Sequence, residues 1–308
     1  MIDFKRILCA VDFSNHSRRA LDHAVAIARQ YESAVTAVYV FPPSPAPAAG
    51  MGAMAIPQMM LTDVDRERLV RDLRAFAAVE SAPGVVIDAV LREGYPATEI
   101  VDCAAALGAN LIVMGTHGRS GVERLLLGSV AERVLRRAQC PVLTVPAGEP
   151  DAVPLGYPIF KSIVCPIDFS AASLLALDYA LAMAREADAH LTILHVVALS
   201  LEQTMLDAAS TEGSETLAEF RRRTEEDLKA QLQATVPADA ADYCRVDTLM
   251  TRGKPGVEVV RTAIARHADL IVMGVHGRGL IDVILFGSTA QHVVRAAHCP
   301  VLTIGQRQ

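Results

Sequence analysis

The chain has 308 residues, 52% of them hydrophobic, and a formal net charge of −6 at pH 7 with no block rich in lysine or arginine. This acidic balance argues against a nucleic acid or an anionic membrane as partner. Because no apolar run reaches about 18 residues and the opening segment lacks an apolar signal core, we expect no membrane contact and a cytoplasmic location.

The first predicted element is an apolar strand that ends in an acid, Ile7 to Asp12, with Ser14 two residues further on. The same pattern returns 156 positions later as Ile163 to Asp168, followed by Ser170. A serine just ahead of an apolar helical stripe is a typical N-cap. We therefore expect Ser14 or Asn15 to start one helix, and Ser170 to start its repeat.

The two halves diverge after their second predicted strands, residues 35–40 and 191–197. Residues 42–60 are rich in proline, alanine, glycine and methionine and have no periodicity, whereas residues 198–215 are polar. We interpret both as surface insertions. A lid is the alternative, because this connection leaves the carboxyl end of a strand, where open α/β sheets bind ligands.

A charged helix then follows in each half, predicted at 63–79 and 217–232. The third strands are predicted at 85–91 and 243–250, each leading through a turn, REGYP or TRGKP, into an amphipathic helix.

The most informative stretch runs from Leu111 and occurs twice. Sliding it by 159 positions onto the stretch from Leu270 matches 20 of 34 residues, where chance would give about two, so the chain contains a duplication. In each copy an apolar strand stops at a glycine, and a helical pattern follows a third glycine. The glycines and the serine after them share one spacing in both copies: Gly115, Gly118, Gly128 and Ser129, and Gly274, Gly277, Gly287 and Ser288.

A junction of strand, glycine loop and helix suits a phosphate group. The first amides of a helix have no internal partner, and the helix dipole adds partial positive charge there. Glycines at 115 and 118 would let the backbone approach a ligand, and the Ser129 hydroxyl would cap the helix or donate to a phosphate oxygen. One such junction is more often plain turn chemistry, but two with identical spacing favour a ligand site.

The order of elements in each half predicts a fold class. Alternating strands and helices indicate α/β: two tandem doubly wound, Rossmann-like domains, 1–146 and 159–308, joined by the Gly/Pro-rich linker 147–158. Each has a five-stranded parallel sheet of order 3-2-1-4-5 with helices on both faces. The order reverses between strands one and four, so Asp12 and Gly115, and their repeats, would flank one crevice.

Six cysteines are present, but their positions argue against disulfides. Cys9 and Cys165 lie at equivalent places in the first strands, and Cys140 and Cys299 precede the closing strands. No CxxC or Cys/His spacing suggests zinc, so we expect buried, reduced thiols.

At this point the chain resembles the universal stress protein family in its tandem form, over nearly the whole chain apart from the linker and 42–60. The resemblance rests on VDFS and PIDFS, on REGYP and TRGKP, and on MGTHGRSGVERLLLGSV and MGVHGRGLIDVILFGST. In that family the spacing G-x2-G-x9-G-(S/T) marks the members that bind ATP.

The resemblance implies the residues of two adenine-nucleotide sites, one in each domain. Adenine and ribose would lie among Val11, Asp12 and Val40 in the first site. Ribose and phosphates would lie along Met114, Gly115, His117, Gly118, Gly128, Ser129 and Val130, with Arg119 facing phosphate or solvent. The second site would comprise Ile167, Asp168, Val196, Met273, Gly274, His276, Gly277, Arg278, Gly287, Ser288 and Thr289.

Alternatives stay open for several of these residues. Asp12 could serve only the dipole of the first helix, and an acid beside phosphates suits a nucleoside-side or metal-mediated role better than direct contact. His117 and His276 could pack loops, and no residue is assigned a catalytic role.

We expect a stress-response or signalling protein that acts by binding ATP or another adenine nucleotide, with the presence of Mg left open. The alternatives are a slow ATPase, disfavoured because no G-x4-GK(S/T) loop or kinase motif is present, and a nucleotide-independent dimeric scaffold.

The closing strands Val142 to Val145 and Val301 to Ile304 are apolar and would lie at sheet edges, which seek partners. We expect them to pair the two domains within one chain, as the family resemblance implies, and leave a homodimer open.

Overall fold

The structure is a computed structural model that describes residues 4–43, 61–78, 84–117, 127–147, 159–198, 215–240, 243–275 and 286–305. Apart from two residues at each end, the chain folds as two compact units, Asp3–Ile159 and Phe160–Gln306. The region between the second strand and the charged helix, and most of the expected linker, lie outside the described residues, so neither expectation is tested.

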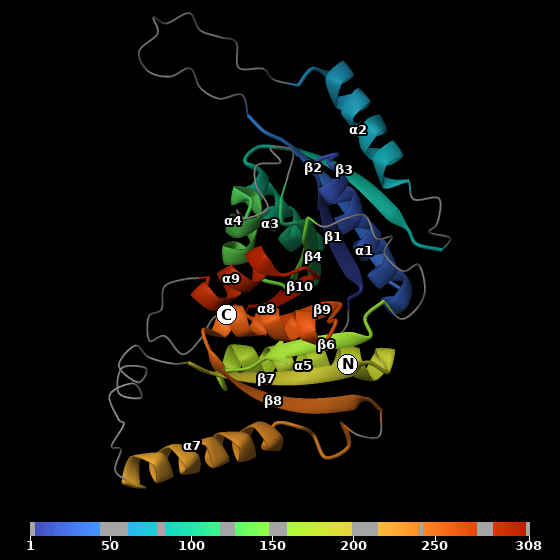
Figure 1. The fold of residues 1–308 in the computed structure, drawn as a ribbon. Coiled ribbons are helices and arrows are strands. Elements are labelled where there is room, and N and C mark those ends of the chain that lie inside the picture. The colour runs from blue at the N-terminus through green and yellow to red at the C-terminus, as the bar shows by residue number, and fades with distance from the viewer. Residues whose placement is uncertain are drawn as a thin grey trace, which may run out of the picture. The chain divides into compact units, whose positions relative to one another are not determined.

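The N-terminal unit is a five-stranded parallel sheet with helices on both faces (Figure 1). Its strand order is β3-β2-β1-β4-β5, which confirms the predicted 3-2-1-4-5 topology. The elements are β1 (Arg6–Val11), α1 (Asn15–Tyr31), β2 (Ala34–Phe41), α2 (Asp63–Ala77), β3 (Ile87–Glu93), α3 (Pro96–Leu107), β4 (Leu111–Gly115), α4 (Ser129–Arg137) and β5 (Val142–Val145).

The C-terminal unit repeats this arrangement with the order β8-β7-β6-β9-β10, again parallel throughout. The elements are β6 (Ser162–Pro166), α5 (Ala171–Ala187), β7 (His190–Ala198), α7 (Glu215–Ala234), β8 (Arg245–Gly253), α8 (Pro255–Ala265), β9 (Leu270–Gly274), α9 (Ser288–Ala296) and β10 (Val301–Ile304). The duplication seen in the sequence is therefore a duplication of one fold.

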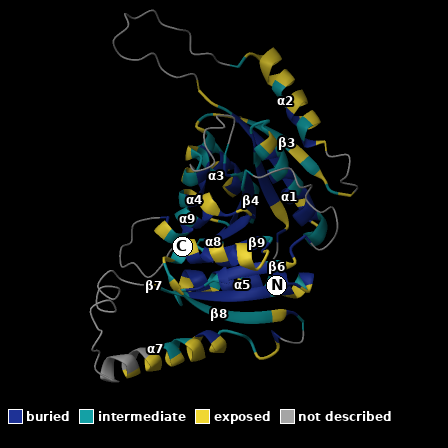
Figure 2. Cartoon of the chain, viewed as in Figure 1, coloured by how far each residue is buried: buried dark blue, intermediate teal, exposed yellow. Residues whose placement is uncertain are grey.

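The core of each unit lies around its first and fourth strands. In the N-terminal unit α1 packs over β1 and β4, while α3 and α4 pack together on the other face. A strand covered on both faces must be apolar on both, and Ile7, Leu8 and Cys9 are accordingly all buried. Figure 2 shows the same pattern, with central strands buried and the outer surfaces of α2 and α7 exposed.

The third strands were predicted two residues too early. They begin at Ile87 and Arg245, in register with Val35 and His190, and they continue into charged residues. Arg92 and Glu93 belong to β3 because it is an edge strand, where side chains reach solvent. An apolar pattern alone therefore placed these strands too near the N-terminus.

The predicted helix starts are confirmed by side-chain caps. Ser14 accepts a hydrogen bond from the Ser17 N–H at the start of α1, and Ser170 accepts one from the Ser173 N–H at the start of α5. Asn15 is the first residue within α1 rather than its cap.

All six cysteines are free, and all but Cys140 are buried, as expected of reduced thiols. Complete burial raises the pKa of the Cys9 and Cys165 thiols well above the ordinary value, with a nearby aspartate adding to the effect in each unit. Both thiols therefore stay protonated and act as small apolar core groups.

No helix in the part of the chain that the structure describes is both long and apolar enough to cross a membrane. The pairing expected between the two closing strands concerns how the units meet, and it stays a prediction.

The glycines that end β4 and β9 are required to different degrees. A Cβ on Gly274 would lie 2.7 Å from the Ala172 carbonyl carbon and 2.9 Å from the Ser173 nitrogen, whereas a Cβ on Gly115 meets nothing nearer than 3.2 Å. We expect Gly274→Ala to destabilise the C-terminal unit by about 1–3 kcal/mol, because helix backbone must move. Calorimetric thermal unfolding should show a smaller shift for Gly115→Ala, and equal shifts would contradict this.

Candidate functional site

The candidate site of the N-terminal unit lies where strand order reverses, between β1 and β4. The two strands pair from Ile7 and Leu111 to Cys9 and Val113, and both continue beyond the last registered pair. Their carboxyl ends therefore lie side by side, which brings Asp12 and Gly115 to one edge of the sheet. Such a reversal is the usual ligand crevice of an open α/β sheet.

The C-terminal unit has the same junction between β6 and β9. Registered pairs are Ile163 with Leu270 and Val164 with Ile271, and β6 then ends at Pro166, which has no N–H to donate. Asp168 and Gly274 lie at the two strand ends. In both units the expected acid and the expected glycine thus lie at the same edge of the sheet.

The carboxylate of Asp12 organises the start of α1. Its Oδ1 accepts hydrogen bonds from the Ser14 N–H, at 3.1 Å, and from the Ser14 hydroxyl, at 2.5 Å. Asp168 accepts from the Ser170 N–H at 3.0 Å in the repeat. The acid therefore has a structural role in both units.

A strained residue follows each acid. Phe13 has φ 65° and Phe169 has φ 62°, a left-handed conformation that costs a bulky side chain about 1–3 kcal/mol. The Phe13 ring lies 4.7 Å from that of Tyr39 on β2, and the Phe169 ring lies 4.8 Å from that of His195 on β7. This backbone conformation turns each ring toward the second strand, at the carboxyl end of the first strand.

The second strands of the two units carry different side chains next to the strained phenylalanine. His195 is buried, and its Nδ1 lies 2.9 Å from the carbonyl oxygen of Ile167, a predicted site residue. Tyr39 occupies the same place in the N-terminal unit, so the two sites are not chemically identical.

The predicted glycines 115 and 274 serve helix packing. The backbone atoms nearest to a Cβ on either glycine belong to the first turn of α1 or α5, or to the chain just after β4. Each glycine therefore has a packing role, because it lets the first helix start against the end of the fourth strand. That Gly115 and Gly118 let the backbone approach a ligand stays a prediction.

Each glycine loop is closed by a hydrogen bond between its two ends. The Gly128 N–H donates to the Thr116 carbonyl oxygen at 2.8 Å, and the Gly287 N–H donates to that of Val275 at 3.0 Å. The predicted contacts Gly118 and Arg119, and His276, Gly277 and Arg278, lie outside the described residues.

The helix that follows the loop begins differently from the expectation. Gly128 and Gly287, not the serines, are the N-caps of α4 and α9, and neither helix has a side-chain cap hydrogen bond. The capping role expected of Ser129 is therefore wrong. Ser129 and Ser288 are the first helical residues and are exposed.

Seven apolar predicted site residues and Thr289 lie at the strand ends or in the first turn of α4 or α9. Five of them are buried, and the remaining three are partly exposed. The buried ones are Val11, Val40, Met114, Ile167 and Met273, and the partly exposed ones are Val130, Val196 and Thr289.

Two polar residues that the sequence analysis did not single out, His16 and Thr116, lie close to the predicted site residue His117 in the N-terminal unit. The His16 ring, from the first turn of α1, lies 6.1 Å from the His117 ring, and the Thr116 hydroxyl lies 2.9 Å from His117 Nδ1. His16 falls in a helix start that reads as ordinary capping sequence, so only its position opposite Gly115 reveals it.

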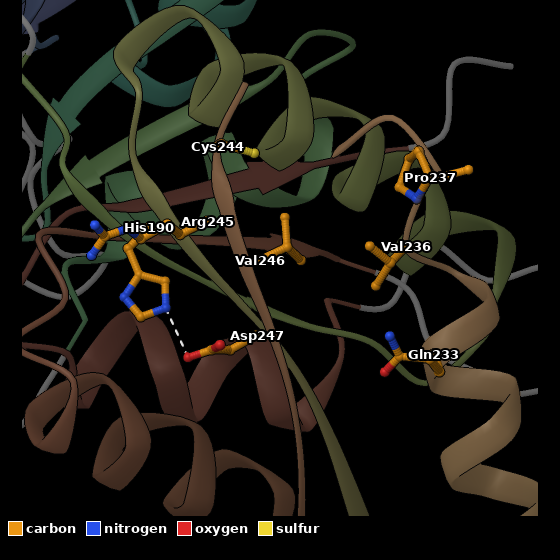
Figure 3. A pocket seen from close by; sticks show the side chains of 9 residues that line it. His190, Gln233, Val236, Pro237, Cys244, Arg245, Val246 and Asp247 are labelled. Carbon is orange, nitrogen blue, oxygen red and sulfur yellow. Dashed lines mark hydrogen bonds and ion pairs between the residues drawn. The ribbon is translucent and has the colours of Figure 1, made fainter. Parts of the chain in front are cut away.

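A separate cavity of about 760 Å³ lies at the amino ends of β7 and β8 (Figure 3). There His190 Nε2 lies 2.8 Å from Asp247, which also pairs with Arg266. This is the sheet edge opposite the predicted crevice, so the cavity is not the predicted site.

The family model described as the universal stress protein family matches residues 3–146 and 159–305. Universal stress protein MJ0531 of Methanocaldococcus jannaschii is 40% identical over 145 residues, 46% of this chain and 82% of its own. Universal stress protein YxiE of Bacillus subtilis is 32% identical over 146 residues, 46% of this chain and 99% of its own. Each relative thus matches one half of the chain.

Among solved structures, a universal stress protein from Archaeoglobus fulgidus superposes with a TM-score of 0.67 at 20% identity, covering 99% of this chain and 98% of its own. At this identity the likeness shows the fold.

The role of Asp12 can be divided into hydrogen bonding and charge. We expect Asp12→Ala to lower the stability of the N-terminal unit by about 1–2 kcal/mol, because Ser14 loses its acceptor. Asp12→Asn keeps an acceptor oxygen and should stay near wild type in calorimetric unfolding. Equal losses in both variants would show that the carboxylate acts through its charge on the helix dipole instead.

Proposed function

The chain belongs to the universal stress protein family, and from this premise we propose that each unit binds an adenine nucleotide, with ATP as the first candidate, at its strand-reversal crevice. The protein then acts in stress response or signalling by binding the nucleotide rather than by transforming it.

The observation that carries the proposal is the pair of helix N-termini at Gly128 and Gly287. Both helices begin at a glycine with no side-chain cap hydrogen bond, directly after a loop closed onto the end of the fourth strand. Uncapped first-turn amides and the helix dipole favour an anion. The first helices carry serine caps, and α3 and α8, which also lack a side-chain cap, begin with a proline that has no N–H. The uncapped starts of α4 and α9 have neither device, which supports a ligand in place of a side chain.

The nucleoside side of each crevice fits an adenosine. Apolar side chains from the first, second and fourth strands form its walls, including Val11, Val40 and Met114. The carboxylate of Asp12, which already accepts hydrogen bonds from Ser14, lies at the same edge and would be the polar group nearest to a ribose. An apolar pocket with a few convergent polar groups is the usual form of such sites.

Mg²⁺ would accompany ATP, since it binds through phosphate oxygens and water with one or two carboxylates. Asp12 and Asp168 are the carboxylates at the crevice edge. The cation would neutralise phosphate charge that these acids otherwise repel.

The proposal can be tested by placing a negative charge at the start of α4 or α9. Ser129→Glu is compatible with the helix, because an acid in the first turn is favourable, but it places negative charge where phosphate would bind. In calorimetric titration of nucleotide-free protein with ATP, wild type should bind two equivalents. Ser129→Glu and Ser288→Glu should each lose one equivalent, and the double variant should lose both.

Ser129→Gln and Ser288→Gln are the matched neutral controls and should keep both sites. Unchanged ATP binding in the double glutamate variant would contradict the proposal, and absence of binding in wild type would favour the nucleotide-independent scaffold. Phosphate release by wild type that the double glutamate variant loses would instead identify a slow ATPase. Denaturing the purified protein and weighing any released nucleotide identifies the natural ligand.

A further inference from the structure

The third strand of the N-terminal unit, β3, has an unpaired outer edge. Among the described strands of this unit, β3 pairs with β2 alone and lies at the end of the sheet (Figure 1). Such an edge presents a row of backbone N–H and C=O groups that can pair with another chain. An extended strand is therefore the kind of partner that this edge fits.

The backbone groups that face outward from β3 belong to every second residue. The Val86 carbonyl oxygen accepts from the Val35 N–H, and the Gly94 N–H donates to the Phe41 carbonyl oxygen, so residues of even number direct their backbone groups toward β2. Because these directions alternate along a strand, residues of odd number direct theirs away from the sheet. This outward set is Ile87, Ala89, Leu91 and Glu93.

Two charged side chains of β3 have no counter-ion in the part of the chain that the structure describes. Asp88 and Arg92 are exposed, and neither forms an ion pair with a described residue. Glu93, by contrast, pairs with Arg66 of α2. Since side chains alternate between the faces of a strand, Asp88 and Arg92 lie on one face, two residues to either side of Val90.

We propose that β3 pairs antiparallel with β3 of a second copy of this chain. In the register that overlaps the two strands completely, Ile87 lies opposite Glu93 of the second copy, and Ala89 lies opposite Leu91. All of these residues belong to the outward set, so each opposed pair exchanges two backbone hydrogen bonds. The register that uses the whole strand is thus also in phase with the free backbone groups.

The same register is complementary in charge. It places Asp88 of each copy opposite Arg92 of the other, so that two such pairs form in one dimer. Both pairs fall at non-hydrogen-bonded positions, where the opposed side chains lie closest. Val90 lies opposite its own copy at the two-fold axis, as a symmetric dimer requires.

Two exposed apolar residues flank the strand, and the pairing brings them near each other. Val86 precedes β3 and is 65% exposed, and Tyr95 follows it and is 71% exposed. In the antiparallel dimer Val86 lies opposite Gly94 of the second copy, next to its Tyr95. Burial of these side chains would add to the stability of the dimer.

The third strand of the C-terminal unit lacks this self-complementary pattern. Asp247 of β8 already contacts His190 and Arg266. Full antiparallel overlap of β8 with a copy of itself would place Asp247 opposite Thr251, which carries no charge. The proposed interface is therefore specific to the N-terminal unit.

The test is an exchange of charges, followed by sedimentation of the full chain over a range of concentrations without nucleotide. Wild type should dimerise. Asp88→Arg and Arg92→Asp should each weaken the dimer by about 10–100-fold, because two opposed pairs change from opposite to like charge. An equimolar mixture of the two variants should dimerise like wild type, since opposite charges then face each other again. Asp227→Arg makes the same change at an exposed residue of α7 and should match wild type.

Amide hydrogen exchange tests the register. The four amide protons of the outward set should exchange more slowly as the protein concentration rises, because pairing protects them. Those of the three residues between them are already bonded to β2 and should not respond. An equal response of both sets would contradict the pairing.

Three results of the sedimentation experiment would overturn the proposal. They are a wild type that stays monomeric, a dimer that Asp88→Arg leaves unchanged and that therefore forms through another surface, and a loss of dimer that mixing the two variants does not restore. Since no nucleotide is present and neither substitution lies at the crevice, these outcomes are independent of the proposed nucleotide binding.

Discussion

The parallel pairing of β1 between β2 and β4 is the constraint on which the rest of each unit depends. It places the reversal of strand order beside β1, so the carboxyl ends of β1 and β4 lie at one edge that helices cannot cover completely. The acid after β1 and the glycine after β4 become neighbours through this pairing alone, although they lie about a hundred residues apart in sequence.

Several unusual local features of the fold lie at this same edge of the sheet. A phenylalanine with positive φ, an acid that holds a serine cap, and a helix that starts without a side-chain cap all occur there in both units. Backbone strain persists only where the surroundings over-determine it. Its recurrence in both units lies at the edge where we propose that the nucleotide binds.

Comparison of the two units also shows which residues differ between them. Tyr39 and His195 face the strained phenylalanines differently, and only the N-terminal unit has His16 and Thr116 beside its glycine. The two units share one fold but carry different polar side chains at this edge, so the two crevices differ in chemistry. The family resemblance concerns the shared fold, whereas these residues distinguish one crevice from the other.

The sequence by itself determined the two-fold repeat, the parallel fold and its strand order, because buried strands are apolar throughout and the glycine spacing recurs. It also predicted the sheet edge at which the candidate site lies. Only the tertiary structure decided that Gly274 is needed for helix packing, that Gly128 and not Ser129 caps α4, and that His16 reaches His117. Those outcomes depend on close approach between segments distant in the chain, which no local pattern of residues records.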